Sequence, residues 1–296
     1  MKLFVTGVGG QLGYEVVCET KKRNLTCVGS DIFDDLNIFD CPYVQLDITN
    51  KEAVEETVLK ISPEVIIHCA AWTNVDAAED NREKVFSINV EGTRNLVESA
   101  KKVNAKFIYI STDYVFSGEG ENPWMPDCEL FSPQNIYGQS KLLGEQIVSN
   151  ELSNYYIVRI SWAFGKNKNF VETMLRIGKQ KDTVSVVNDQ FGTPTYMPDV
   201  AKLLIDMSMT DKYGKYHVTN EGGYITWYDF TKEIYKQARL DTKIIPVSSS
   251  EYKTKAKRPS NSRLDKSKLK ENGFNTLPDW RDALERYLAT LNLEEL

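Results

Sequence analysis

The sequence predicts an α/β fold built on a doubly wound parallel sheet, and three observations carry this prediction. Strand-like apolar runs alternate with helical patterns through the first half of the chain. Two of these runs, at residues 65–71 and 107–110, are almost continuously apolar, as strands covered by helices on both faces require. The first run passes directly into a glycine-rich turn and then a helical pattern. Right-handed crossovers would join such units into one sheet.

The bulk composition of the 296 residues excludes several classes of protein. A net charge of -6 argues against a nucleic-acid surface. There is no charged-then-apolar leader and no long apolar run, so we expect no signal peptide and no membrane span. Five scattered cysteines predict reduced thiols in the cytoplasm, and with only His68 and His217 we predict no metal site. Both histidines are expected in the core.

The first strand, Lys2 to Thr6, runs into a turn with three glycines, Gly7, Gly10 and Gly13. This spacing permits a tight turn, close approach of the backbone to a diphosphate, and close packing of the next helix. That helix begins near Gln11 and Leu12, where free N–H groups and the positive end of the helix dipole would meet the phosphates. The pattern favours a Rossmann-type dinucleotide site over a glycine turn without a ligand.

Acids follow the next two strands. The strand at 26–30 ends at Asp31, where a ribose contact is expected, and an acid there favours NAD over NADP because it repels a 2′-phosphate. A helix cap is the alternative role for this residue. The strand at 43–46 ends at Asp47 and Ile48, just before a helix start at Thr49-Asn50. Asp47 could meet the adenine edge, and capping accounts for it equally well.

The buried strand at 65–71 ends in Ala70 and Ala71, whose small side chains leave room for a cofactor. A loop with Thr73 and Val75 follows over the same edge of the sheet. A long helix is predicted over 80–103, and it carries Asn89. This residue is either an exposed polar side chain or a buried amide that ties the helix to the sheet near the site.

The strand at 107–110 ends at Ser111-Thr112-Asp113, so Thr112 lies at the edge where ligands of open parallel sheets bind. Its hydroxyl could bond a substrate oxygen or only the local turn. Residues 114–135 form a long proline-containing loop, which is a candidate lid. On the helix that follows, Tyr137 and Lys141 are four residues apart and share one face. The amine would lower the pKa of the phenol and prepare it for proton transfer, unless the two are an ordinary surface pair.

Beyond Phe164 the pattern changes. Helices near 171–181, 197–209, 227–238 and 280–291 alternate with short strands near 184–187, 216–219 and 244–247. We therefore expect a dinucleotide-binding domain over 1–163, to which later segments return, and a smaller α/β substrate domain over 164–296. A basic run from Lys253 to Arg258 is either a solvated face or an anchor for a diphosphate.

These motifs together resemble the extended short-chain dehydrogenase/reductase superfamily, and within it the dTDP-4-dehydrorhamnose reductase family. The resemblance covers the whole chain and rests on the glycine turn, on Ser111-Thr112-Asp113, on Tyr137-x-x-x-Lys141, and on local stretches at 70–76, 111–116, 159–162, 189–195 and 258–262. The last three include Arg159-Ile160-Ser161-Trp162, Asp189-Gln190-Phe191-Gly192 and Arg258-Pro259.

The resemblance implies reduction of the C4 ketone of dTDP-4-dehydro-L-rhamnose to dTDP-L-rhamnose by NADPH or NADH. It implies that Tyr137 donates the proton, that Lys141 holds the nicotinamide ribose, and that Thr112 bonds the sugar oxygen. The substrate contacts would then be Thr73, Val75, Thr112, Asp113, Tyr114, Trp162 as the stacking aromatic, and Arg258 at the diphosphate. The cofactor contacts would be Gly7, Gly10, Gln11, Leu12, Gly13, Asp31, Asp47, Ile48, Ala70, Ala71, Thr73, Tyr137 and Lys141.

Other readings stay open. One is a reductase or epimerase of another 4-keto-6-deoxy sugar nucleotide. Another is a non-catalytic subunit, since the regulatory subunit of methionine adenosyltransferase resembles this family, and a third is a pure binding module. The family includes magnesium-bridged dimers, so a homodimer is an expected assembly, although its metal ligands cannot be located in this sequence.

Overall fold

The computed structural model describes residues 1–34 and 41–292. Its centre is a seven-stranded sheet in the order β11-β6-β5-β4-β1-β2-β3, in which every neighbouring pair is parallel. The strands are β1 (Lys2–Thr6), β2 (Thr26–Asp31), β3 (Tyr43–Gln45), β4 (Val65–His68), β5 (Lys106–Thr112), β6 (Tyr155–Ile160) and β11 (Gly214–His217). This arrangement confirms the predicted doubly wound parallel sheet, whose strand order reverses between β1 and β4.

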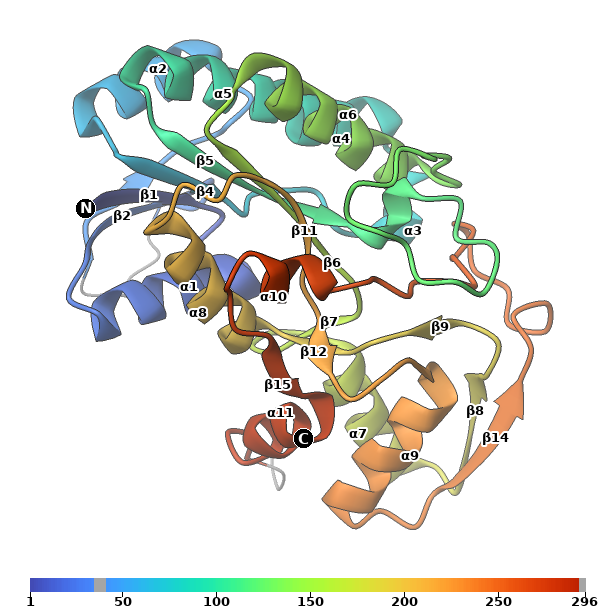
Figure 1. The fold of residues 1–296 in the computed structure, drawn as a ribbon. Coiled ribbons are helices and arrows are strands. Elements are labelled where there is room, and N and C mark those ends of the chain that lie inside the picture. Colours follow the sequence, from blue (N-terminus) through green and yellow to red (C-terminus); the bar gives the residue numbers. More distant parts are fainter. Residues whose placement is uncertain (35–40, 293–296) are drawn as a thin grey trace.

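Helices cover both faces of the sheet (Figure 1). One face packs against α2 (Lys51–Ile61), α5 (Gly92–Val103) and α6 (Ile136–Glu151) through a core that includes Phe4, Ile66, Leu96 and Phe107. The other face packs against α1 (Gln11–Lys22) and α8 (Met197–Ser208) through Val5, Val16, Ile67 and Leu204. Two layers of helices therefore exclude water from the strands, which explains their almost continuous apolar runs.

The remaining elements build a smaller cluster around a core of its own, which includes Phe164, Leu175, Phe230, Trp280 and Leu284. Its strands pair in twos as β10-β7, β12-β15, β13-β9 and β14-β8. They are β7 (Ala163–Phe164), β8 (Thr183–Val187), β9 (Phe191–Gly192), β10 (Thr195–Tyr196), β12 (Asn220–Glu221), β13 (Ile225–Thr226), β14 (Lys243–Val247) and β15 (Leu277–Asp279). The helices are α7 (Phe170–Gln180), α9 (Trp227–Ala238) and α11 (Trp280–Leu288), whereas α10 (Ser267–Glu271) contacts β11, and its Leu269 belongs to the core beside α1 and α8.

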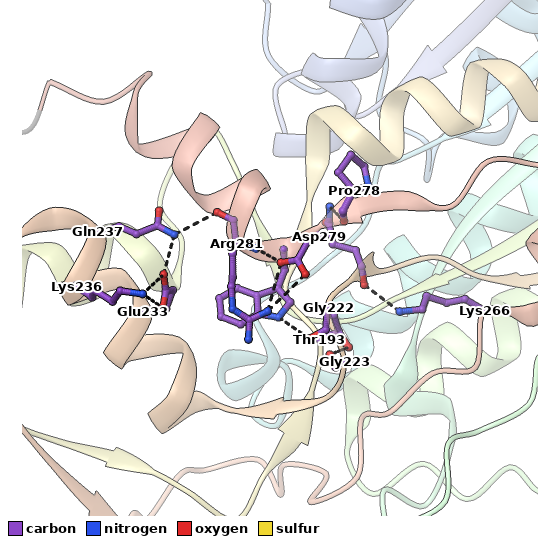
Figure 2. Close-up of polar contacts among 12 residues, drawn as sticks. Thr193, Gly222, Gly223, Glu233, Lys236, Gln237, Lys266, Pro278, Asp279 and Arg281 are labelled. Atoms are coloured by element: carbon purple, nitrogen blue, oxygen red, sulfur yellow. Dashed lines mark hydrogen bonds and ion pairs between the residues drawn. The ribbon is translucent and has the colours of Figure 1, made fainter.

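Polar contacts join the last elements of the chain (Figure 2). The Gln237 amide on α9 donates to the carbonyl of Arg281 on α11 at 3.2 Å, and Thr193 donates to the carbonyl of Gly223 at 3.1 Å. Lys266 donates to the carbonyl of Asn220 at 3.0 Å. The helix predicted near 227–238 is confirmed as α9, and the Thr226 hydroxyl and the Asp229 carboxylate at its start cap each other's backbone N–H groups.

The long helix predicted over 80–103 is confirmed, with a π-turn that the sequence did not predict. The chain is helical without a break from Arg82 to Val103, as α4 (Arg82–Phe86), a π-helical turn at Ser87–Glu91 and α5, and the short helix α3 (Val75–Ala78) precedes it. The strand predicted over 65–71 ends earlier, at His68. The strand near Tyr216 also has a partner that the sequence did not predict, since it extends the main sheet beside β6.

Candidate active site

The carboxyl ends of β1, β4 and β5 meet at one edge of the sheet. Gly7 follows β1, Ala70 lies just past β4, and Thr112 is the last residue of β5. The register pairs Thr6 with His68 and Thr112 with Ile160, so Trp162, two residues beyond β6, belongs to the same edge. The structure therefore brings together residues that are more than 150 positions apart in the sequence, at the place where parallel sheets bind ligands.

The glycine turn can accept only glycine at two of its positions. Gly7 has φ +72°, and a Cβ there would lie 2.5 Å from the backbone N of Ala70. A Cβ at Gly13 would lie 2.2 Å from the carbonyl O of Gly7. Gly10 precedes α1 without a side-chain cap, and no acid lies in the first helical turn. This part of the described chain therefore keeps a tight backbone cradle and free N–H groups, which fit the diphosphate of a dinucleotide.

The other predicted cofactor residues differ in what their side chains already contact. Asp31 accepts the N–H of Gly9 at 2.9 Å and the N–H of Ile32 at 2.8 Å, so this carboxylate holds the glycine turn rather than capping a helix. Asp47 accepts the N–H and hydroxyl of Thr49 in a local turn. The side chains of Leu12 and Ile48 are buried in the two cores, and only their backbones remain available to a ligand.

A second loop, which the sequence did not single out, closes over the glycine turn. Asn167, with φ +70°, donates to the carbonyl of Gly9 at 3.3 Å. Gln11 donates to the carbonyl of Lys168 at 3.2 Å. The Lys166 ammonium lies 3.4 Å from the centre of the Tyr14 ring. Gln11 therefore contacts protein at the mouth of the predicted phosphate site.

Tyr137 lies in the first turn of α6, where two side chains fix the start of the helix. Asn135 accepts the N–H of Gly138 at 2.8 Å, and Glu79 accepts the N–H of Ile136 at 2.9 Å. Both satisfy N–H groups that a helix start leaves unpaired. The Tyr137 phenol lies beside the Thr112 side chain, and its ring meets the Tyr114 ring edge-on at 5.8 Å. The predicted phenol and hydroxyl are thus direct neighbours.

The predicted lowering of the Tyr137 pKa is wrong for the protein without ligands. Burial raises the pKa of this phenol, and the nearby Asp113 raises it further. The neighbouring Thr112 side chain opposes only part of this shift in pKa. The sequence pattern placed Tyr137 and Lys141 on one helix face, but it contained no information about burial. A phenol in this environment keeps its proton through the neutral range.

Lys141 is nearly fully buried, with only 3% of its surface exposed. Its ammonium lies 4.0 Å from the centre of the Tyr109 ring. Burial lowers the pKa of Lys141 to about 7, against the opposing effect of the Glu145 carboxylate. The group is therefore poised to change charge near neutral pH.

Asn89 lies in the π-helical turn and is buried, which confirms the second of its two predicted roles. Its amide accepts the N–H of Trp72 at 2.7 Å and donates to the Ser140 hydroxyl at 2.9 Å. Ser140 in turn donates to the carbonyl of Tyr137 at 2.7 Å. One amide therefore joins the loop after β4 to the helix that carries Tyr137 and Lys141, and such π-turns are frequent at functional sites.

Asp113 is a buried carboxylate beside this group. Its Oδ1 accepts the Thr112 hydroxyl at 3.0 Å, whereas its buried Oδ2 has no hydrogen-bond partner within the described residues. Burial raises the pKa of Asp113 from 3.8 to about 6. Because the folded-state pKa is the higher one, folding favours the protonated acid, and stability is lost as the pH rises from about 4 to about 6.

Replacing Asp113 with asparagine should therefore stabilise the protein above neutral pH. A shift of about two units corresponds to about 3 kcal/mol in the free energy of unfolding at pH 8. The gain should disappear near pH 4, where the acid is already neutral. Urea unfolding at both pH values measures it, with the exposed Asp241 changed to asparagine as the control. An equal effect of Asp113→Asn at pH 4 and pH 8 would contradict the assigned cause.

Among the predicted substrate residues, Tyr114 contacts Arg258. Its guanidinium donates to the Asp76 carboxylate at 2.6 Å and to the Tyr114 hydroxyl at 3.4 Å. Asp76 also accepts the N–H of Ala256 at 3.0 Å. Val75 begins the same short helix α3, and Thr73 is exposed just before it. The sequence named the stretch that contains Asp76 but assigned this carboxylate no role.

Trp162 has φ +49° and stacks on Trp227, with ring centres 3.7 Å apart. A Cβ at Gly192 would lie 2.7 Å from the Trp162 ring, so the glycine makes room for the indole. The Trp162 ring thus packs against Trp227 on one face. The sequence did not predict Trp227 as its partner.

Both histidines are buried, as predicted. Thr6 and Thr93 contact the two ring nitrogens of His68 at 2.8 and 3.1 Å, and burial lowers its pKa to about 3. Among residues 1–34 and 41–292, no group of histidine, cysteine or acidic side chains could hold a metal ion. None of the helices described is both long and apolar enough to span a bilayer.

The chain matches the family described as RmlD substrate binding domain over residues 1–293. It is 36% identical to the dTDP-4-dehydrorhamnose reductase of Escherichia coli K12, in an alignment that covers 98% of each chain. It is also 34% identical to the spore coat polysaccharide biosynthesis protein SpsK of Bacillus subtilis, over 97% of this chain and 96% of that protein.

Solved structures agree with these matches. The dTDP-4-dehydrorhamnose reductase of Bacillus anthracis, solved in complex with NADP, superposes with a TM-score of 0.90 at 39% identity, covering 98% of this chain and 99% of that one. The Clostridium acetobutylicum orthologue gives 0.91 at 37% identity, with the same coverage. A UDP-glucose 4-epimerase of Thermus thermophilus reaches 0.84 at 19% identity, which is a likeness of fold alone.

Proposed function

Because this chain belongs to the dTDP-4-dehydrorhamnose reductase family, we propose that it reduces the C4 ketone of dTDP-4-dehydro-L-rhamnose with Tyr137 as the proton donor. The chain is an oxidoreductase that works with NADPH or NADH. The observation that carries the role of Tyr137 is its position beside the Thr112 side chain, at the edge of the sheet that also holds the glycine turn.

The reduced nicotinamide, when bound, supplies the hydride. The chain's own residues supply the proton and the surroundings of the ketone. Tyr137 keeps its proton because burial raises the pKa of the phenol, so the proton is available when negative charge develops on the sugar oxygen. Thr112, which touches the phenol, offers a second hydroxyl to that oxygen. Lys141 adds positive charge one helical turn further on, and its ammonium can hold ribose hydroxyls.

The glycine turn and the first turn of α1 would hold the cofactor diphosphate, with Ala70 and Ala71 beside it. Asp31 reaches the end of β2 with both oxygens already bonded to backbone N–H groups. Its carboxylate is therefore partly neutralised by the turn, which weakens its repulsion of a 2′-phosphate. We propose that both NADPH and NADH are accepted.

Arg258 is the proposed anchor for the substrate diphosphate, and Asp76 orients it. The ion pair with Asp76 uses the Nη2 group of the Arg258 guanidinium, so further N–H groups can bind phosphate oxygens. Asp76 also holds the backbone at Ala256, so one carboxylate fixes both the charge and the segment that carries it.

Replacing Asp76 with asparagine should raise KM for the nucleotide sugar about 3-fold to 10-fold with little change in kcat, since it removes a charge-assisted bond but keeps an acceptor for Ala256. Steady-state kinetics measures this split. Lys255→Met is the matched control. Lys255 lies on the same segment as Arg258, is exposed, and forms an ion pair with Asp80. A lower KM in Asp76→Asn would instead make Asp76 a competitor of the diphosphate.

The direct test of function offers dTDP-4-dehydro-L-rhamnose with each cofactor and follows the absorbance of the reduced nicotinamide. Consumption of cofactor with formation of dTDP-L-rhamnose supports the proposal. Product analysis separates reductases of other 4-keto-6-deoxy sugars. Interconversion of sugar epimers without net cofactor consumption would favour an epimerase, and no turnover of any sugar nucleotide would favour a non-catalytic subunit.

We further propose that the protein is a cytoplasmic homodimer with a nucleotide sugar as its small-molecule partner. The cytoplasmic assignment rests on the odd number of five scattered cysteines, which is typical of reduced thiols rather than a disulfide framework. Light scattering of the purified chain measures the assembly.

A further inference from the structure

An ion pair lies in the interior directly behind the proposed site. Glu145 on α6 and Arg159 on β6 are joined by two hydrogen bonds, of 2.8 and 2.7 Å, in a two-pronged arrangement. Their side chains are 3% and 0% exposed. Arg159 opens the stretch at 159–162 that is shared with the reductase family, yet neither residue has a part in the proposed chemistry.

A buried ion pair is weak grounds for stability, because removing two charges from water costs about as much as their attraction returns. What this pair does is connect elements. The Ser111 hydroxyl, one residue before Thr112, donates to Glu145 at 2.5 Å. Arg159 donates to the carbonyl of Pro126 in the 114–135 loop at 2.9 Å and lies 3.3 Å from the His217 ring nitrogen on β11. The pair thus joins the helix, the strand end and the loop that surround the site.

The carboxylate also lies one helical turn beyond Lys141, on the same face of α6. The groups facing Lys141 from β4 and β5 are neutral at pH 7. Burial lowers the pKa of His68 to about 3, raises the pKa of Cys69 to about 12, and raises that of Tyr109 well above its ordinary value. Tyr137, one turn earlier on α6, is neutral as well. Glu145 is therefore the anion that acts on this ammonium.

We propose that Glu145, held in place by Arg159, is a positioning residue that favours the charged form of the Lys141 ammonium one helical turn away and fixes the strand end that carries Thr112. The inference rests on the proposed function. This positioning role explains why the pair is buried there. Stability does not explain it, because a buried ion pair contributes little net stability. Burial alone would leave Lys141 largely neutral, and the nearby carboxylate counteracts this by raising the pKa of the ammonium.

The direct test is a titration of Lys141 in the cofactor-free protein. The 13Cε signal of Lys141 is followed by NMR in protein with labelled lysine, and Lys141→Met identifies it. In wild type the midpoint should lie near 7, the value to which burial lowers the pKa of Lys141. Glu145→Gln keeps the shape and an acceptor for Ser111 but removes the charge, so the midpoint should fall by about one unit or more. Glu145→Asp keeps the charge and should stay within about half a unit of wild type.

A wild-type midpoint in Glu145→Gln would overturn the inference, and so would an equal shift in Glu145→Asp. If Glu145→Gln does not fold, Glu145→Gln with Arg159→Met removes both charges together, which interiors tolerate. Its midpoint should also fall, and an unchanged one counts against the proposal.

Activity supplies a second readout. The alkaline limb of kcat should move to lower pH in Glu145→Gln and stay in place in Glu145→Asp, whereas general damage to the fold would lower kcat at every pH. Should wild type reduce no sugar, the proposed function fails, and the titration still decides the role of Glu145.

Discussion

Replacing Tyr137 with phenylalanine should lower kcat for reduction of the 4-keto sugar by about 10²-fold to 10⁴-fold, the range that a positioned general acid contributes. The substitution removes one oxygen and keeps the ring that packs edge-on against Tyr114. Cofactor affinity should change much less than kcat, because the glycine turn and Lys141 still hold the dinucleotide. Single-turnover kinetics at saturating substrate measures the chemical step directly.

Tyr114→Phe is the matched control. Its phenol is also buried, but it contacts Arg258 instead of Thr112, so its loss should appear mainly in KM. Near wild-type turnover in Tyr137→Phe would remove Tyr137 from the acid role, and an equal loss of kcat in both variants would point to a general effect of cavities in this region.

Gly7→Ala should abolish dinucleotide binding and destabilise the fold by about 2–4 kcal/mol. A Cβ at this position would lie 2.5 Å from the N atom and 2.6 Å from the Cα of Ala70, so the clash is with backbone that cannot rotate away. The φ of +72° adds the steric cost of a left-handed conformation. Fluorescence titration with NADPH and urea unfolding measure the two effects.

Gly120→Ala separates these two costs. Gly120 has φ +82°, yet a Cβ there would have no atom within 4 Å. This variant should lose about 1 kcal/mol from conformation alone and bind the cofactor normally. If Gly7→Ala loses no more stability than Gly120→Ala and binds NADPH with wild-type affinity, the close approach of Gly7 to Ala70 is not what requires a glycine at this position.

The sequence predicted best where local pattern and tertiary environment agree. The strand at 2–6 and the helix at 227–238 have the predicted bounds, because the strand ends at a glycine turn and the helix begins at a cap. The region 80–103 looks uniformly helical in composition and is helical from Arg82 to Val103, but the sequence did not predict the π-turn inside it. The buried amide of Asn89 binds Trp72 and Ser140 there, and a π-turn accommodates it.

The candidate site was predictable in its members but not in its electrostatics. A spacing of four residues places Tyr137 and Lys141 on one helix face, yet the direction of the Tyr137 pKa depends on burial and on Asp113, which a linear pattern does not report. Glu145 carried a signal, since it lies four residues beyond Lys141. Its partner Arg159 comes from another strand, and only the fold reveals the pairing. The roles of the individual residues stay proposals.

The position of α8 and β11 late in the chain has a consequence for biosynthesis. Six of the seven sheet strands have been synthesised once the chain reaches residue 160. The helix that completes one face of the sheet, α8, begins only at Met197, and the edge strand β11 begins only at Gly214. Until these elements are made, the nascent chain exposes an apolar face of the sheet that no helix covers. Such exposed apolar surface binds chaperones and promotes aggregation. The smaller cluster is inserted between these parts of the sheet, so synthesis must pass through much of it before the larger half can mature.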